Sequence, residues 1–240
     1  FLLMLSKTKL RPTREDRRFD REILSETFTI GLPALGTTFV SCFGYIAFAR
    51  MVSGMGTTIF AAHSIAITAE QIVYIPGYGL RVATSTLVGN ALGEKDIRKL
   101  KATERVSILI TLLIMVVNGI GLYLFAYPFM RLFTNSVNAA RIGSEMLRLV
   151  SFSEPFFGLM IVLEGISYGM GRTKHVFACE AVSMWGIRIF GTFLCVNVFG
   201  LGLKAVWLCM IADNICKAIL LYIFRPKHVE ENADDRGELR

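Results

Sequence analysis

The sequence has little charge for its length. Charged residues make up 19% of its 240 positions, whereas hydrophobic residues make up 53%, and the mean hydropathy is +0.53. This balance excludes a disordered chain, which buries too little apolar surface to fold, and it does not fit a soluble globular domain. We expect a membrane protein whose first partner is the lipid bilayer. A bilayer core of roughly 30 Å requires about 20 apolar residues per helix, so the length accommodates about six spans.

Cysteine and histidine are scarce and are poorly placed for metal binding. The five cysteines lie in apolar stretches without a C-x-x-C motif, and the three histidines complete no ligand spacing. We therefore expect no metal site and no cofactor. The net charge of +7 could indicate nucleic-acid binding, but that function needs Lys and Arg gathered on one folded face. Here the basic residues lie in connections between apolar segments, so no nucleic-acid partner is expected.

Six apolar segments predict six transmembrane helices, and hence an all-α polytopic membrane protein. They extend over residues 23–49, 57–92, 106–127, 139–171, 175–198 and 204–224. Pro76 in the second segment and Pro155 in the fourth have glycines nearby. Because proline removes a backbone hydrogen bond and crowds the preceding turn, both helices are predicted to kink.

Basic residues are distributed unevenly among the connections. Eighteen precede the first helix, separate the second from the third, or follow the fourth and the sixth, whereas the alternate connections hold four. Cytoplasmic loops carry the excess of Lys and Arg in multi-pass membrane proteins. We therefore expect a plasma-membrane protein with both termini in the cytoplasm.

The first residues indicate a truncated beginning. Residues 1–5 are apolar, do not begin with Met and lead into a basic stretch, the reverse of the order in a signal peptide. We expect 1–22 to be the end of a truncated helix followed by a basic cytoplasmic linker, 23–225 to be the helical lobe, and 226–240 to be a cytoplasmic tail.

Charged side chains at membrane depth are the first candidates for functional residues. Such groups are energetically costly in hydrocarbon and usually face the interior of a helix bundle or a water-filled cavity. There are eight of them: Glu70, Arg81, Glu154, Glu164, Glu180, Arg188, Asp213 and Lys217. Asp213 and Lys217 are four residues apart on one helix face, which favours a neutralised structural pair. Glu180 and Arg188 are eight residues apart, too far to touch, so each needs a partner on another helix.

Glu154 and Glu164 are the first candidates for ion binding. They flank the predicted kink of the fourth helix, and neither has a basic residue three or four positions away. An unpaired carboxylate at membrane depth could bind and release H⁺ or Na⁺. For Glu164, an equal alternative is that it reaches the cytoplasmic interface. The other substrate-binding or ion-binding candidates are Glu70, Gln71, Tyr45 and Arg188.

The segment 165–169 satisfies the pattern G-x-S-x-G of a nucleophile elbow. That motif needs a strand-to-helix turn, whereas this segment lies in a predicted transmembrane helix, where small residues allow close helix packing. An intramembrane serine protease would be a remote alternative. His228 lies in the tail and His175 at the entrance of a helix, which leaves His63, and this residue is predicted near the opposite side of the membrane from Ser167. No catalytic residue is assigned, and the chain is not expected to be an enzyme.

Several motifs in fixed order carry a family resemblance. G-L-P at 31–33 opens the first helix, and A-A-H at 61–63 follows a glycine-bearing turn. V-G-N-A-L-G at 88–93 ends the second helix before a basic linker, and G-M-G-R-T at 169–173 ends the fourth. Together these motifs resemble the multidrug and toxic compound extrusion (MATE) family over about residues 23–225.

The resemblance implies one lobe of a twelve-helix transporter. MATE proteins have two six-helix lobes with both termini cytoplasmic, and this chain is similar to the C-terminal lobe, so the partner would be the N-terminal lobe. The implied function is antiport: a small cationic drug leaves the cell by alternating access in exchange for H⁺ or Na⁺.

Some family features are replaced in this sequence. Members of the Na⁺ type carry acids near the positions of Ser41 and Phe157, and an arginine-glycine pair stands where this chain has Tyr168 and Gly169. The chain therefore looks more like the branch related to the DNA-damage-inducible protein, in which the coupling acid belongs to the N-terminal lobe.

A lipid or polysaccharide flippase of the same wider superfamily is the alternative function. Such a protein would line its cavity with several basic residues to hold phosphates. This chain offers Arg81, Arg188 and Lys217 at membrane depth.

Overall fold

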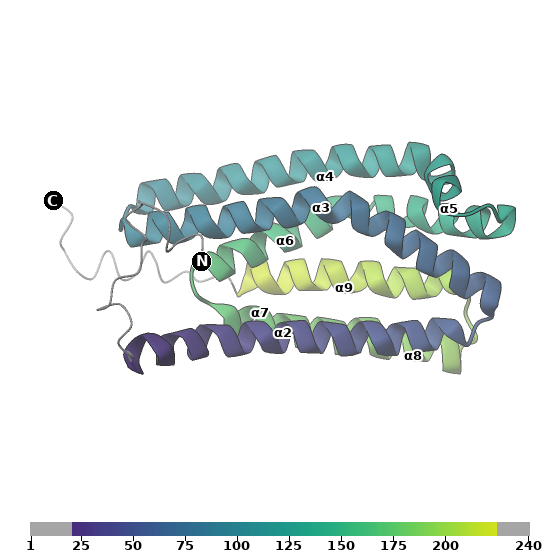
Figure 1. The fold of residues 1–240 in the computed structure, drawn as a ribbon, viewed down its shortest axis with the longest axis horizontal. Helices are drawn as coiled ribbons and strands as arrows, with labels where there is room; N and C mark the ends of the chain where they lie inside the picture. Colours follow the sequence, from purple (N-terminus) through teal and green to yellow (C-terminus); the bar gives the residue numbers. More distant parts are fainter. Residues whose placement is uncertain (1–20, 225–240) are drawn as a thin grey trace, which may run out of the picture.

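The computed structural model describes residues 21–224, apart from the side chains of Glu22 and Glu26, as a bundle of long helices (Figure 1). The elements are α2 (Arg21–Ser53), α3 (Thr57–Gly93), α4 (Ile97–Phe133), α5 (Val137–Ser151), α6 (Glu154–Gly169), α7 (Thr173–Ser183), η2 (Met184–Ile189), α8 (Phe190–Phe193), η3 (Leu194–Val198) and α9 (Leu203–Ile223). Five described segments are long and apolar enough to cross a membrane, or six if the bent pair α5 and α6 forms one span. The all-α polytopic fold class is confirmed.

Successive spans run back and forth along the bundle. The start of α2, the turn between α3 and α4, and the end of α9 lie at one end, whereas the turn between α2 and α3 lies at the other (Figure 1). In the turn between α2 and α3, Gly56 has φ +113°, a conformation that glycine adopts without steric cost. In the turn between α3 and α4, the side chain of Asp96 caps α4 by accepting a hydrogen bond from the backbone N–H of Lys99 at 2.9 Å.

The two predicted kinks take different forms. The fourth span breaks at residues 152–153, and α5 and α6 meet there at 61°. Pro155 lies in the first turn of α6, where its missing N–H costs nothing, so it begins a helix rather than bending one. In contrast, α3 stays helical through Pro76, which lies near the middle of its sequence. The ribbon of α3 changes direction about midway (Figure 1).

The fifth span, Thr173–Val198, contains two π-helical segments, η2 and η3. A π-helix widens the turn and is common at functional sites. Arg188 belongs to η2 and is buried. The widened turn therefore lies where a charge must be accommodated inside the bundle.

Close packing of α3 against α6 depends on glycines of the 165–169 segment. A Cβ atom on Gly165 would lie 2.7 Å from the carbonyl oxygen of Arg81, and one on Gly169 would lie 2.6 Å from that of Ser85. Both obstacles are backbone atoms, which cannot rotate aside. The interpretation of this motif as a helix-packing surface is confirmed.

We expect Gly165→Ala to lower the free energy of unfolding by about 1–3 kcal/mol, because the added methyl forces the two backbones apart. Chemical denaturation in detergent micelles measures this value. Gly121→Ala is the matched control, since no atom lies within 4 Å of a Cβ there. The control should be neutral or stabilising by up to about 1 kcal/mol. Equal effects of the two substitutions would contradict the proposed backbone contact.

Candidate functional site

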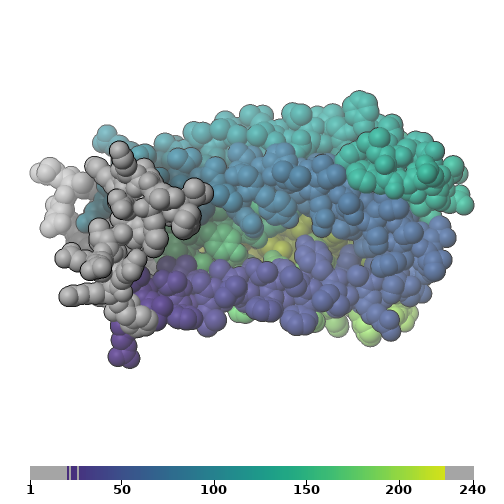
Figure 2. Space-filling model, viewed as in Figure 1, coloured from purple at the N-terminus to yellow at the C-terminus, as the bar shows by residue number. Residues whose placement is uncertain are grey.

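A cavity of about 650 Å³ opens between α2 and α3. Figure 2 shows the hollow, with atoms of later segments in green and yellow at its base. Its polar and charged lining comes from α2, α3, α6, α7 and α9, and comprises Thr37, Thr38, Ser41, Tyr45, Tyr78, Arg81, Ser85, Thr86, Glu164, Tyr168, Glu180, Asn214 and Lys217. In a chain with so few charges, their convergence on one cavity marks it as the candidate substrate site.

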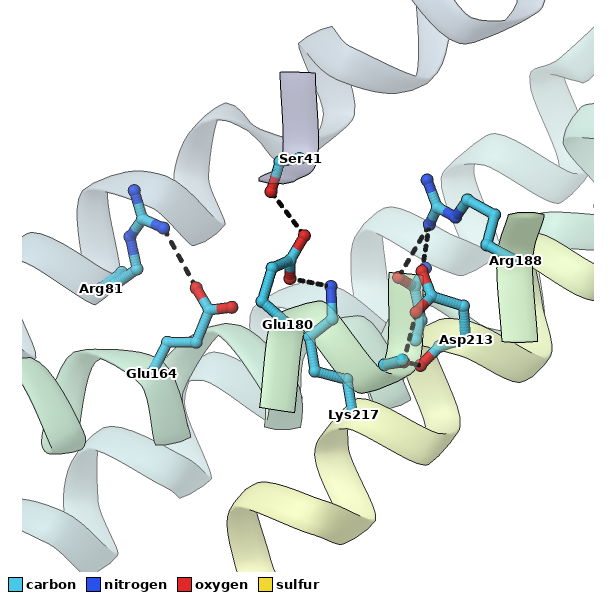
Figure 3. A network of polar contacts seen from close by, with 9 residues as sticks. Ser41, Arg81, Glu164, Glu180, Arg188, Asp213 and Lys217 are labelled. Carbon is cyan, nitrogen blue, oxygen red and sulfur yellow. Dashed lines mark hydrogen bonds and ion pairs between the residues drawn. The ribbon is translucent and has the colours of Figure 1, made fainter. Parts of the chain in front are cut away.

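Glu164 forms one charged wall of the cavity. Its Oε2 atom lies 3.1 Å from the guanidinium Nη1 of Arg81 on α3 (Figure 3). Arg81 also lies over the ring of Tyr78, 5.3 Å from its centroid. The side chain of Glu164 is 9% exposed, so its carboxylate is held inside the bundle. Its basic partner, Arg81, lies on another helix. Residue spacing along the helix of Glu164 could therefore not identify this partner.

Glu180 forms a second charged wall. One carboxylate oxygen lies 2.5 Å from the ammonium nitrogen of Lys217 on α9, and the other accepts a hydrogen bond from the hydroxyl of Ser41 on α2 (Figure 3). Ser41 stands where some relatives are expected to carry an acid. Here the carboxylate of Glu180, from α7, lies within hydrogen-bond distance of Ser41.

Arg188 and Asp213 make a deeper ion pair. Their Nη2 and Oδ2 atoms are 2.8 Å apart, and the two side chains are 4% and 0% exposed. Arg188 also donates a hydrogen bond to Asn214 and lies over the ring of Tyr45, 5.5 Å from its centroid. The hydroxyl of Ser183 donates to the carbonyl and to the carboxylate of Asp213. This cluster joins η2 firmly to α9.

The predicted direct pair between Asp213 and Lys217 is therefore wrong. Lys217 pairs with Glu180 and Asp213 pairs with Arg188. Because α7 and α9 run in opposite directions, the earlier residue of one span meets the later residue of the other (Figure 1). The prediction that Glu180 and Arg188 need partners on another helix is confirmed.

Glu154 lies in a separate buried cluster at the break between α5 and α6. It is 0% exposed, and neither carboxylate oxygen has a hydrogen-bond partner among the described residues. Glu70 is near enough to interact with it electrostatically, and accepts a hydrogen bond from the hydroxyl of Tyr74. Two neighbouring buried carboxylates favour a bound cation that offsets their charge.

The acid cluster adjoins the cavity through aromatic rings. The ring of Tyr74 stacks on that of Phe157, with centroids 3.7 Å apart, and Phe157 lines the cavity. Gly119 leaves room for Glu154, since a Cβ there would lie 3.2 Å from the Cβ of Glu154. The stacked rings of Tyr74 and Phe157 thus lie between Glu70 and the cavity.

Of the remaining candidates, Tyr45 lines the cavity, whereas Gln71 is exposed and is not among the lining residues. The sequence did not indicate the contacts of Ser41, Asn214 and Tyr74, because the candidates were chosen mainly for their charge. Only Tyr74 had a usable signal, since it lies one helical turn after Glu70.

The protease alternative is wrong. The hydroxyl of Ser167 donates to the carbonyl of Leu163 at 2.9 Å, and Nδ1 of His63 accepts a hydrogen bond from the indole of Trp207 at 3.2 Å. Both groups are buried in separate contacts, so Ser167 and His63 do not form a pair.

The sequence profile of the family described as MatE matches residues 33–194, about two thirds of the chain. The chain belongs to the MatE family. This assignment places it with transporters rather than with membrane enzymes, and makes it a multi-pass membrane protein.

Curated MatE relatives are about twice as long as this chain. A probable multidrug resistance protein NorM of Thermotoga maritima is 30% identical over 201 residues, which cover 83% of this chain and 43% of the relative. A probable NorM of Photorhabdus laumondii is 27% identical over 227 residues, covering 93% and 50%. The chain thus spans about half the length of the relatives it matches.

Solved structures show the same fold. A MOP superfamily transporter from Pyrococcus furiosus superposes with a TM-score of 0.86 at 21% identity, covering 95% of this chain and 52% of that one. An outward-facing multidrug resistance MATE family transporter gives a TM-score of 0.85 at 20% identity, covering 97% and 52%. The described bundle is therefore half of a MatE transporter fold.

Proposed function

We propose that this chain is the C-terminal lobe of a MATE-type exporter that moves small organic cations out of the cell in exchange for H⁺ or Na⁺. The observation that supports this most directly is the cavity with Glu164 and Glu180 in its walls. The rings of Tyr45, Tyr78 and Phe157 line the same cavity and offer faces for cation–π contact with a cationic substrate. Alternating access requires a second bundle to close over such a cavity, which the N-terminal lobe would supply.

The proposed division of the chain is a basic inter-lobe linker at 1–22, the lobe at 23–225 and a cytoplasmic tail at 226–240. Residues 1–20 and 225–240 lie outside the described residues. The proposed location is the plasma membrane with both termini cytoplasmic. The start of α2 and the end of α9 lie at one end of the bundle, which would put both on one side of the membrane, and the basic-residue asymmetry favours the cytoplasmic side (Figure 1).

Glu154 and Glu70 are the proposed ion-responsive groups of this lobe, since both are buried carboxylates and Glu154 has no hydrogen-bond partner. In the branch related to the DNA-damage-inducible protein, which this sequence resembles, the coupling acid belongs to the N-terminal lobe. The two sites would then act together. The flippase alternative is less well supported, because the curated relatives of this chain are named as multidrug resistance proteins, and because Arg81 and Lys217 are each paired with a carboxylate.

Transport tests the proposal directly. We expect vesicles containing only residues 1–240 to show no ion-driven uptake of a fluorescent organic cation, because one lobe cannot close both gates. Vesicles containing the complete parent protein should show it. Sustained gradient-dependent uptake with residues 1–240 alone would instead indicate a homodimeric half-transporter, and absence of uptake with the parent would contradict the proposed exporter.

Topology is tested by labelling single cysteines in a background without the native ones. Lys99 lies just after the turn from α3 to α4, and Asn135 lies in the turn from α4 to α5. We expect Lys99→Cys to react from the cytoplasmic side and Asn135→Cys from the external side, as the basic-residue asymmetry requires. Reaction of both from one side would contradict the six-span arrangement.

A further inference from the structure

A second hollow lies on the outside of the bundle, between α2 and η2. Its volume is about 590 Å³, and it is lined by apolar side chains and one charged residue, Arg50. Phe39, Phe43 and Ile46 form its α2 side and are all more than half exposed. None of its lining residues borders the cavity proposed for the substrate. We refer to this hollow as the outer groove.

The outer groove has the length of one lipid chain. Phe39 and Arg50 are 11 residues apart on α2. At 1.5 Å per residue, this separation is about 16 Å, close to half of a bilayer core of roughly 30 Å. Arg50 lies in the last turn of α2, so with α2 as a membrane span we expect the groove to reach from the membrane surface to about the bilayer centre.

The two ends of the groove differ in chemistry. Arg50 is exposed and forms no ion pair within the described residues, so its guanidinium is available to a phosphate, which it can bind in bidentate fashion. Trp185 lies at the middle of the span Thr173–Val198, not in the interfacial belt where tryptophan is common. An apolar partner at mid-membrane depth explains this position.

We propose that the outer groove binds one acyl chain of an anionic phospholipid, with the lipid phosphate on Arg50 and the chain against Phe39, Phe43 and Trp185. A zwitterionic lipid binds less well because its own cation competes with Arg50 for the phosphate. The site is separate from the transport cavity, and its occupant is a component of the membrane.

The chain contains two tryptophans, which makes the test simple. Trp185 lines the groove, whereas Trp207 is 0% exposed. The 240-residue chain is placed in phosphatidylcholine nanodiscs that contain a fixed fraction of either brominated phosphatidylglycerol or brominated phosphatidylcholine. Bromine atoms near the chain ends quench nearby indoles. The signal of Trp185 is the difference between the wild type and Trp185→Phe, so no substitution of the buried Trp207 is needed.

We expect the brominated anionic lipid to be enriched about fivefold over the zwitterionic one at Trp185, the preference conferred by one basic residue at the membrane surface. Arg50→Gln should abolish the preference while quenching by both lipids continues. Arg141→Gln is the matched control, because Arg141 is an exposed arginine of α5, outside the groove. This control should keep the preference.

Equal quenching by the two lipids would overturn the proposal. So would a preference that survives Arg50→Gln or is lost equally in Arg141→Gln. Absence of quenching of Trp185 by either lipid would show that protein, not lipid, covers the groove, and would also overturn it.

Discussion

Asp213→Asn is expected to lower the free energy of unfolding by about 3–5 kcal/mol, because it leaves the buried guanidinium of Arg188 without its counter-charge. Arg188 and Asp213 are 4% and 0% exposed, so water cannot replace the lost carboxylate. The variant should also express at lower yield. Denaturation of the purified chain in detergent micelles measures the change.

An exposed ion pair of the same bundle provides the control. Lys204 and Glu145 are 3.0 Å apart, but their side chains are 71% and 46% exposed. Glu145→Gln should therefore change the free energy of unfolding by less than about 1 kcal/mol. A further variant, Asp213→Asn with Arg188→Met, should recover part of the loss because it removes the unpaired charge. Equal losses of unfolding free energy in Asp213→Asn and Glu145→Gln would contradict the conclusion that burial makes the pair of Asp213 and Arg188 important for stability.

Glu154→Gln in the complete parent protein is expected to abolish most of the ion-driven efflux and to alter its pH dependence. The substitution keeps the shape of the side chain but removes the group that gains and loses a proton or holds Na⁺. The carboxylate of Glu154 has no hydrogen-bond partner to lose, so the free energy of unfolding should not fall. Efflux of a fluorescent cation from vesicles at several pH values measures the first effect, and denaturation measures the second.

Glu145→Gln is the matched control for Glu154→Gln, because both carboxylates belong to the bent pair α5 and α6, and Glu145 is the exposed one. Its efflux should equal that of the wild type. The proposed roles would be reversed if Glu154→Gln kept normal pH-dependent efflux while Asp213→Asn folded normally but was uncoupled.

Part of the candidate site was predictable from the sequence. The eight charged residues at membrane depth were identified because a charge within a 20-residue apolar segment is conspicuous in any reading of the chain. The need of Glu180 and Arg188 for partners on other helices was also correct. The identity of those partners was not predictable, since the spacing rules used for Asp213 and Lys217 compare residues only within one helix.

The sequence by itself determined the apolar spans, the irregularities near Pro155 and Pro76, and the family. Each of these depends on hydropathy, proline chemistry or motifs over short stretches of chain. Only the tertiary structure decided which charges pair, that Glu164 and Glu180 share one cavity, and that Glu154 lies without a partner beside Glu70. The physical reason is that hydropathy does not determine how each helix is rotated about its axis or shifted along it relative to the others. Side-chain packing between segments distant in sequence sets both.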